Sequence, residues 1–151
     1  ARLGVNNVVV QIDIVDNSII TNSGGLERDA LAFEHLFGQF GAGMWVKCSY
    51  NTSAGVHGLG GTPLRANYPG GAYDEDNPWY YDATYDIFRK NRPKDKDGDV
   101  CASWTLNTTK GYWESPLTRP EETREEIIAG KIYKWDESAY QADNSKGWVL
   151  E

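Results

Sequence analysis

The chain has 151 residues, which is long enough for one domain with a hydrophobic core and no disulfide staples. Aromatic residues make up 13 % of it and there are 16 glycines, a mixture that favours short strands and tight turns over a helical bundle. Its formal charge of −7 disfavours a phosphate-binding surface, so we expect no direct binding to nucleic acid. The sequence contains no apolar run of about 18 residues, so we expect no membrane span.

The two cysteines and the start of the chain leave the cellular compartment open. Cys48 and Cys101 can form one disulfide or remain as two free buried thiols. The first residues lack the basic-then-apolar pattern of a secretory signal. Either the protein is cytosolic when it is made, or a leader has been removed.

The first predicted element is a β-strand over residues 5–15. Ile12 and Ile14 alternate with polar neighbours, which is the spacing of a strand with one polar face. Residues 16–18 are typical of a turn, so we expect residues 19–20 to return as a second short strand.

An amphipathic helix is predicted next, over residues 26–37. Apolar residues recur there at three- and four-residue steps and share one face: Leu26, Ala30, Phe33, Phe37 and Phe40. We expect Ser23 to cap this helix, Glu27 to lie in its first turn and Gly38 to end it.

A strand over 44–50 follows, and we expect Trp45 to pack against the phenylalanines of the helix. Residues 51–71 are rich in glycine and show no periodicity. About twenty structureless residues in a small domain often carry function or contact another chain. We therefore include His57 and Arg65, both in this stretch, in a candidate interface; no spacing around His57 indicates a metal site.

Three successive aromatic residues, Trp79, Tyr80 and Tyr81, are the most site-like feature of the sequence. They cannot all face one core from a strand, so at least one should be exposed or covered by a partner. Core and rim packing, a protein interface and a sugar-binding surface beside the carboxylates of 74–76 all remain open. Together with the two residues of the glycine-rich stretch, the three aromatics complete the candidate interface.

A charged loop over 91–99 follows a short strand predicted at 85–88. Residues 95–99 resemble part of a calcium loop, but Pro93 occupies a position that needs an acid and Trp104 the position of the bidentate acid. We therefore predict a surface turn there.

A hairpin over 102–116 has a tryptophan on each arm. Trp104 and Leu106 follow strand spacing, and Trp113 resumes the bulky pattern after a polar loop at 107–111. That loop ends in a glycine, which suits one left-handed residue. Two large aromatics on one short hairpin should bury much apolar area.

A second, surface helix is predicted over 120–129, capped by Thr118 and stopped by Gly130. The last elements are two strands at 131–136 and 147–150, with a polar loop between them.

These elements predict an α+β fold that is mainly antiparallel β. We expect a compact single domain over 1–151, with one amphipathic helix packed on the sheet and a short surface helix. Its parts are a strand-helix-strand half at 5–50, a loop-rich middle at 51–100, and tryptophan-rich hairpins at 101–151 with the helical insertion near 120–129.

Motifs of enzyme chemistry are missing from the sequence. It has no nucleophile elbow, Walker loop, zinc-protease motif or dinucleotide glycine motif, and its cysteines are not a C-x-x-C pair. Glu114, Asp136 and Glu137 could form a glycosidase-like carboxylate pair, but among 22 acids chance proximity is the simpler reading. We predict a non-enzymatic protein without metal or cofactor.

Short motifs also follow one another in a characteristic order. They are Asn-Asn-Val-Val-Val at 6–10, Phe-Gly at 37–38 before Trp45, Ser-Tyr-Asn at 49–51, Arg-Ala-Asn-Tyr-Pro-Gly at 65–70, Tyr-Asp at 73–74 or 85–86, an aromatic at 88, Ala-Ser-Trp-Thr-Leu-Asn at 102–107, Trp-Glu-Ser-Pro at 113–116, Tyr-Lys-Trp-Asp-Glu at 133–137 and Trp148. This order resembles a family of small, mostly uncharacterised proteins of tailed phages of marine bacteria, including T4-like cyanophages. The sequence departs from the family at 54–61, in the charged loop and in the insertion at 121–129.

The resemblance implies a virion component, made in the host cytoplasm, that is bound to the major capsid protein or other virion proteins and present in many copies or as a homo-oligomer. The hypothesis is a capsid-surface decoration or cement protein. One alternative is a tail, neck or fibre-associated protein. An alternative of another class is a carbohydrate-binding module that stacks glycans on Trp79, Tyr80, Tyr81 or Tyr140.

Overall fold

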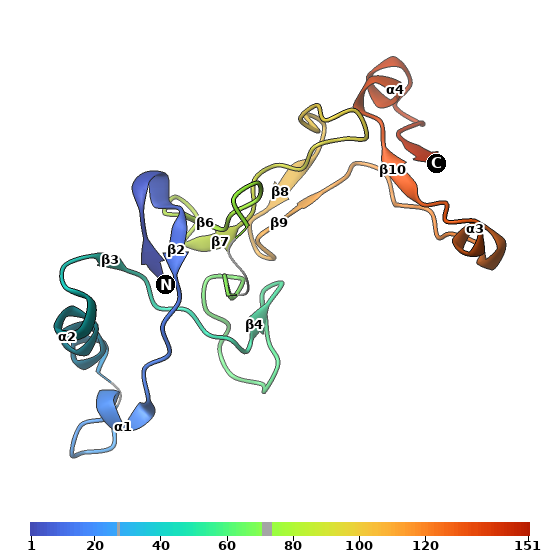
Figure 1. Ribbon diagram of the computed structural model, residues 1–151. Helices are drawn as coiled ribbons and strands as arrows, with labels where there is room; N and C mark the ends of the chain where they lie inside the picture. The colour runs from blue at the N-terminus through green and yellow to red at the C-terminus, as the bar shows by residue number, and fades with distance from the viewer. Residues whose placement is uncertain (27, 71–73) are drawn as a thin grey trace. The chain divides into compact units, whose positions relative to one another are not determined.

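The computed structural model describes residues 1–26, 28–70 and 74–151, and the chain divides into two compact units (Figure 1). Unit 1 consists of Ala1–Arg89 and Thr109–Gly111, and unit 2 of Lys90–Thr108 and Tyr112–Glu151. Antiparallel strand pairs and a few short helices make the chain roughly α+β. One domain over the whole chain stays a prediction, because a compact unit is not by itself an independent domain. Sequence expectations at three positions fall outside the described residues: Glu27, Gly71 and Tyr73.

Unit 1 contains a three-stranded antiparallel sheet in the order β2-β1-β3. Its strands are β1 (Arg2–Leu3), β2 (Val9–Gln11) and β3 (Met44–Trp45). Leu3 of the central strand lies opposite Val9, and both side chains are buried. The sheet is built from very short strands, so side-chain contacts must supply much of its stability.

The strand predicted over 5–15 is wrong in its extent. A 3₁₀ turn at Val5–Asn7 precedes β2, and Asn6 and Asn7 adopt left-handed backbone angles there, with φ of 56° and 60°. Asparagine enters this region more readily than most other residues with a side chain. The two asparagines therefore permit a turn where the valines indicated extended backbone.

Two helices follow β2 and contact each other (Figure 1). α1 spans Asn17–Ile20, so the strand predicted at 19–20 is wrong. Asp16 caps α1 by accepting a hydrogen bond from the backbone N–H of Ser18 at 2.7 Å. α2 spans Asp29–Phe40.

The ends of α2 differ from the prediction. Its N-cap residue is Arg28, which makes no capping hydrogen bond with its side chain, so the prediction that Ser23 caps the helix is wrong. Gly38 lies inside it, and Gly41, with φ of 73°, ends it. A single glycine inside a helix costs only about 1 kcal/mol, so two further residues continue the helix past Gly38.

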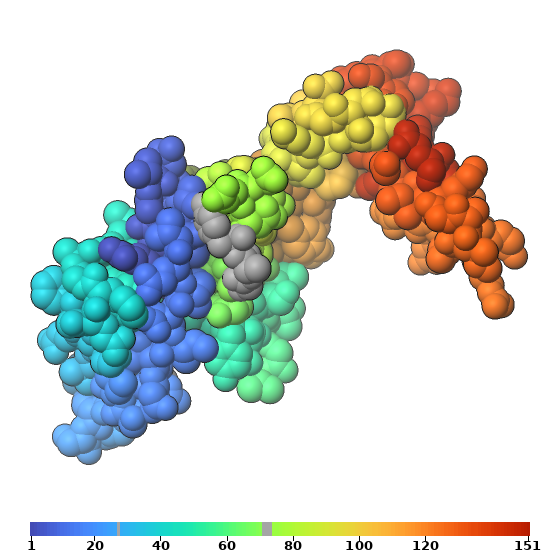
Figure 2. Space-filling view, viewed as in Figure 1, coloured from blue at the N-terminus to red at the C-terminus, as the bar shows by residue number. Residues whose placement is uncertain are grey.

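The apolar face of α2 is only partly covered. Leu36 is buried, whereas Phe33 and Phe37 are 43 % and 64 % exposed. The expected contact with β3 exists at the end of the helix, where the rings of Phe40 and Trp45 lie 5.8 Å apart. In the space-filling view the teal atoms of α2 lie at the surface (Figure 2).

Residues 51–70 of the glycine-rich stretch are not structureless, so that prediction is wrong. β4 (Thr52–Ser53) pairs with β5 (Val56–His57) in a tight antiparallel hairpin. Both turn residues, Ala54 and Gly55, adopt left-handed backbone angles, with φ of 50° and 76°.

A further hairpin joins β6 (Tyr80–Asp82) to β7 (Ile87–Arg89) and carries the centre of the core. Phe88 is fully buried. The cluster around it is small: Ala1, Leu3, Val9 and Phe88, with Ile12, Val46, Cys48, Trp79 and Tyr81 packed against it.

Unit 2 contains two antiparallel strand pairs, both at the predicted places. β8 (Thr105–Asn107) pairs with β9 (Tyr112–Glu114), and β10 (Tyr133–Trp135) pairs with β11 (Trp148–Leu150). Gly111, at the end of the β8–β9 loop, has φ of 70°, which confirms the predicted left-handed residue.

The helices of unit 2 correct two predictions. α3 is shorter than predicted and spans Arg124–Ile128. Its cap is Thr123 rather than Thr118, in a reciprocal capping box with Glu126. α4 (Glu137–Ala142) occupies the segment predicted as a polar loop, because Asp136 caps it by accepting a hydrogen bond from Ala139 N–H at 2.7 Å.

A cluster of aromatic rings forms the interior of unit 2. The ring of Trp135 lies 5.8 Å from Trp104, 5.2 Å from Trp148 and 5.3 Å from Tyr140. The two indole pairs are close to edge-to-face, at 80° and 76°, a favourable geometry for aromatic rings. Gly147 fits against this cluster, since a Cβ there would lie 2.4 Å from the Trp135 ring.

Candidate functional site

The aromatic run of the candidate interface is mostly engaged in unit 1. Trp79 packs against the core cluster, and the ring of Tyr81 lies 5.4 Å from that of Phe88. Tyr80 is half-buried in β6, opposite Arg89 in β7. These side chains therefore support the fold, and none of the three stands out as an exposed platform.

Arg65 and Tyr81 meet at one carboxylate. Asp86 Oδ1 accepts hydrogen bonds from Arg65 Nε at 2.7 Å and from the Tyr81 hydroxyl at 2.6 Å. Arg65 also donates through Nη1 to Lys47 O at 2.8 Å. The hydrogen bond to Asp86, together with burial, raises the pKa of Tyr81. The structure thus brings two of the candidate residues together, in a link between three chain segments.

His57 has a different role. Its Nδ1 accepts hydrogen bonds from the backbone N–H groups of Leu59 and Gly61, at 3.3 Å and 3.1 Å. This arrangement places the ring proton on Nε2 and holds the loop after β5. His57 therefore shapes the glycine-rich stretch, and it shares no hydrogen bond with Arg65 or Tyr81 among the described residues.

Asn67 is the residue that sequence reasoning missed in unit 1. It is 8 % exposed, and its Oδ1 accepts from Ala54 N–H at 2.9 Å. Its Nδ2 lies within hydrogen-bond distance of three backbone oxygens, those of Phe88, Lys110 and Gly111, at 3.0–3.1 Å. One buried amide therefore joins three separate parts of unit 1, and its partners are 13 to 44 residues away in sequence.

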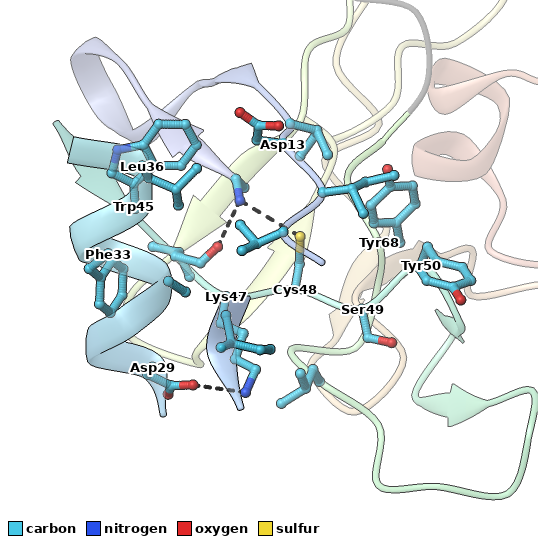
Figure 3. Close-up of a pocket in the computed structure, with 18 of the residues that line it drawn as sticks. Asp13, Asp29, Phe33, Leu36, Trp45, Lys47, Cys48, Ser49, Tyr50 and Tyr68 are labelled. Atoms are coloured by element: carbon cyan, nitrogen blue, oxygen red, sulfur yellow. Dashed lines mark hydrogen bonds and ion pairs between the residues drawn. The ribbon is translucent and has the colours of Figure 1, made fainter. Parts of the chain in front are cut away.

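A cavity of about 530 Å³ lies in unit 1 (Figure 3). Phe33, Leu36 and Trp45 lie on one side of it, and Tyr50 and Tyr68 on the opposite side. The walls come from residues 12–20, from α2 and from residues 45–51 and 62–68. The size and the largely apolar lining are typical of a small-molecule site.

Polar groups also line this cavity, among them an amino terminus and an ion pair. The Ala1 amino group donates to Val46 O at 2.8 Å and to Cys48 Sγ at 3.7 Å, and burial lowers the pKa of this amine. Lys47 Nζ and Asp29 Oδ1 form an ion pair at 2.8 Å.

Asp13 also lines the cavity, at the end opposite this ion pair (Figure 3). Its Oδ2 is buried and has no hydrogen-bond partner among the residues that the structure describes. Buried carboxylate oxygens normally have partners, so this atom is the chemically unusual feature of the cavity.

The three carboxylates considered as a glycosidase-like set all hold the structure of unit 2. Glu114 accepts from Asn107 at 3.0 Å, and Asp136 caps α4. Glu137 is 8 % exposed and accepts four hydrogen bonds, from Ser103 N–H, Ser103 Oγ, Trp135 Nε1 and Gln141 Nε2, at 2.8–2.9 Å. Burial by itself would raise the pKa of Glu137, but these hydrogen bonds hold it below the ordinary carboxyl value.

The charged loop 91–99 forms a turn, as predicted, and the turn is fastened to Glu137. Asp95 Oδ1 accepts from the N–H groups of Asp97 and Asp99, each at 2.9 Å, and Oδ2 accepts from Glu137 N–H at 3.1 Å. Asp95 thus ties the loop to the start of α4.

Neither cysteine forms a disulfide within the described residues. Burial raises the pKa of the Cys101 thiol to about 11, and the charges of Asp95 and Glu137 add to this rise. Cys101 is therefore an unreactive core residue rather than a nucleophile.

Over the described ranges, no group of three or more His, Cys, Asp or Glu side chains is placed to hold a metal ion. None of the described helices has the length and apolarity to cross a lipid bilayer. No known protein family, no curated protein and no solved structure matches this chain.

Proposed function

We propose that this chain is a non-enzymatic structural component of a tailed-phage virion, a decoration or cement protein on the capsid surface. The order of its motifs, which resembles small proteins of marine tailed phages, supports the proposal. Its partners would be the major capsid protein or other virion proteins, and it would be present in many copies on the particle.

The observation that carries the proposal is the amount of apolar side chain left exposed in unit 1. Eight large apolar residues there are each at least 61 % exposed: Val5, Ile14, Leu26, Phe37, Met44, Tyr50, Val56 and Leu59. Single exposed apolar residues are ordinary, but such a set around a small core favours burial against neighbouring proteins. A specific contact needs about 1,000 Å² of total buried area, which several such patches on a particle surface can supply together.

Part of this exposed apolar surface, at α2 and β3, is also hollowed. A groove of about 510 Å³ lies along α2 and β3, with Phe33, Phe37 and Trp45 as walls and Gly41 and Gly43 between them. Aromatic side chains around a recess are typical of protein contact sites. This surface supports an interface at α2 and β3, which lies outside the aromatic run at 79–81.

The glycine-rich stretch remains part of the proposed contact surface. Val56 lies in the β4–β5 hairpin and is 65 % exposed. Leu59, 78 % exposed, lies in the loop after β5 that His57 holds in shape. A shaped loop with exposed apolar tips can enter a recess on a neighbour with little loss of conformational entropy.

The carbohydrate-binding alternative gains no support from the rings that it needs. Trp79 and Tyr81 pack on the core of unit 1, and Tyr140 lies 5.3 Å from Trp135 in unit 2. A glycan platform requires an exposed aromatic face, and these faces are covered at least in part by protein.

Mass spectrometry of purified particles from the source phage tests the proposal. We expect the chain in the particles at a fixed ratio to the major capsid protein. A few copies per particle would favour the tail, neck or fibre alternative. Complete absence from the particles would overturn the virion proposal.

Rebinding to particles that lack the chain tests the surface itself. Phe37→Glu and Leu59→Glu should each weaken rebinding at least about tenfold, since a charge in an apolar contact costs several kcal/mol. Ile128→Glu, at an exposed apolar position of unit 2 that is not part of this set, is the matched control and should rebind normally. Equal rebinding by all three variants would place the contact elsewhere.

A further inference from the structure

The apolar cavity of unit 1 (Figure 3) carries an inference that does not depend on the virion proposal. Its volume of about 530 Å³ lies within the range of small-molecule sites, roughly 300–1,000 Å³. Phe33, Trp45 and Tyr68, from three different segments, line it, so the cavity depends on the tertiary fold of unit 1. A space of this size with an apolar lining favours an apolar guest over bulk water.

The polar groups of the cavity set the chemistry of that guest. Lys47 and Asp29 neutralise each other at 2.8 Å, and the amino group of Ala1 donates to Val46 O and Cys48 Sγ. Asp13 Oδ2 is different, because it is a buried acceptor without a hydrogen-bond partner in the part of the chain that the structure describes. Leaving such an oxygen unpaired is costly, so a donor on a bound molecule would be stabilised if the Asp13 side chain turns to meet it.

We propose that this cavity binds a small amphipathic molecule, with an apolar body and one hydrogen-bond donor, an amine or a hydroxyl, directed at Asp13. A carboxylate or phosphate at that end of the molecule is disfavoured, because it would place a second negative charge beside Asp13. The apolar walls supply affinity, and Asp13 supplies the selection against anions.

Three probes with nearly the same body separate these contributions: phenethylamine, phenethyl alcohol and hydrocinnamate. Titration calorimetry on the full chain gives the dissociation constants, and amide shifts of residues 45–49 in NMR spectra give the location. We expect both donors to bind, and hydrocinnamate to bind at least about tenfold more weakly, the size of effect that one charged hydrogen-bond partner produces. No binding by any probe, or equal binding of hydrocinnamate, would overturn the proposal.

Asp13→Asn tests the role of the carboxylate. The variant should lose most of the discrimination, so that hydrocinnamate binds within about threefold of phenethyl alcohol. Asp99→Asn removes the same charge from an exposed turn of unit 2 and should keep the discrimination intact. Unchanged selectivity in Asp13→Asn, with NMR spectra of a folded protein, would contradict the assignment of Asp13.

Two substitutions on α2 test the cavity independently of charge. Ala32 lines the cavity and Ala30 is exposed on the same helix. Ala32→Leu should weaken both donors at least about tenfold by filling the space, whereas Ala30→Leu should leave them unchanged. Equal binding by the two variants would place the probes elsewhere on the protein. All these measurements use the isolated chain, so their failure would leave the virion proposal standing.

Discussion

The two units of this chain stabilise short strands in different ways. Unit 1 uses a buried amide, Asn67, to join backbone groups of three chain parts around a small apolar core. Unit 2 is stabilised by aromatic packing, because Trp104, Trp135 and Trp148 contact one another. Glu137 adds a hydrogen bond that it accepts from the indole of Trp135. Strands of two or three residues have few ladder hydrogen bonds, so each unit needs such a device. The difference predicts that unit 1 is sensitive to backbone fit and unit 2 to charge and packing.

Gly111→Ala should cause the largest loss, and it tests backbone fit in unit 1. Its φ is 70°, and a Cβ would lie 2.4 Å from Asn67 Nδ2 and 2.9 Å from Phe88 O. Strain and overlap together should lower the free energy of unfolding by about 4 kcal/mol in urea denaturation. Gly98→Ala, with φ of 90° and open space around its Cβ, should lose only about 1 kcal/mol. Equal losses would mean that the close approach does not matter.

Asn67→Ala should be nearly as damaging. It leaves the N–H of Ala54 and the carbonyls of Phe88, Lys110 and Gly111 without their buried partner, at a cost of about 3 kcal/mol. Hydrogen exchange should be faster at the Ala54 N–H, which loses its acceptor. The exposed Asn144→Ala is the control and should change stability by less than about 0.5 kcal/mol. A loss no larger than that of the control would remove Asn67 from its proposed role.

Glu137→Gln tests the charge dependence of unit 2. A glutamine keeps one acceptor oxygen but turns an NH₂ toward donors, so we expect a loss of about 2 kcal/mol at neutral pH. Because the folded pKa of Glu137 is below its ordinary value of 4.5, its contribution is complete above that value and disappears as the pH falls through the lower folded pKa. The variant should therefore lose less stability on acidification than the unmodified chain. Glu125→Gln, at an exposed position, is the matched control and should cost less than about 0.5 kcal/mol at neutral pH.

The two thiols give the smallest effect, a difference in labelling without a change of stability. At pH 8 a thiol with a pKa of about 11 is roughly one part in a thousand thiolate. Iodoacetamide should therefore modify the half-buried Cys48 first, and Cys101 only after denaturation. Labelling of native Cys101 at the faster rate would contradict its buried environment.

Local patterns predicted part of the fold. The β8–β9 and β10–β11 pairs follow from alternating bulky residues, and Gly111 from the need for a left-handed residue at the end of a loop. The start of α3 was also readable, because Thr123 and Glu126 form the pattern of a capping box, but Pro120 suggested an earlier start.

The remaining features depend on residues that are distant in sequence. Asn67 has no local signal, since its partners lie at 54, 88, 110 and 111. The cavity is lined by Ala1 and four longer segments, so the position of Asp13 in its wall follows only from tertiary structure. The exposure of Phe33 and Phe37 likewise depends on which face of α2 finds a neighbour, and helical spacing does not decide this.

Because Thr109–Gly111 belongs with residues from the first 89, the border between the units is crossed three times along the chain. A fragment truncated after Arg89 would lack the carbonyls of Lys110 and Gly111 that Asn67 holds, and it would leave Gly55 without the backbone of Thr109 against which it fits. Shortening or deleting the tip of the β8–β9 loop would do the same damage while removing only a few residues. Limited proteolysis at the border should therefore release no intact N-terminal piece, and in evolution this loop should tolerate insertions and deletions less well than its exposed position suggests.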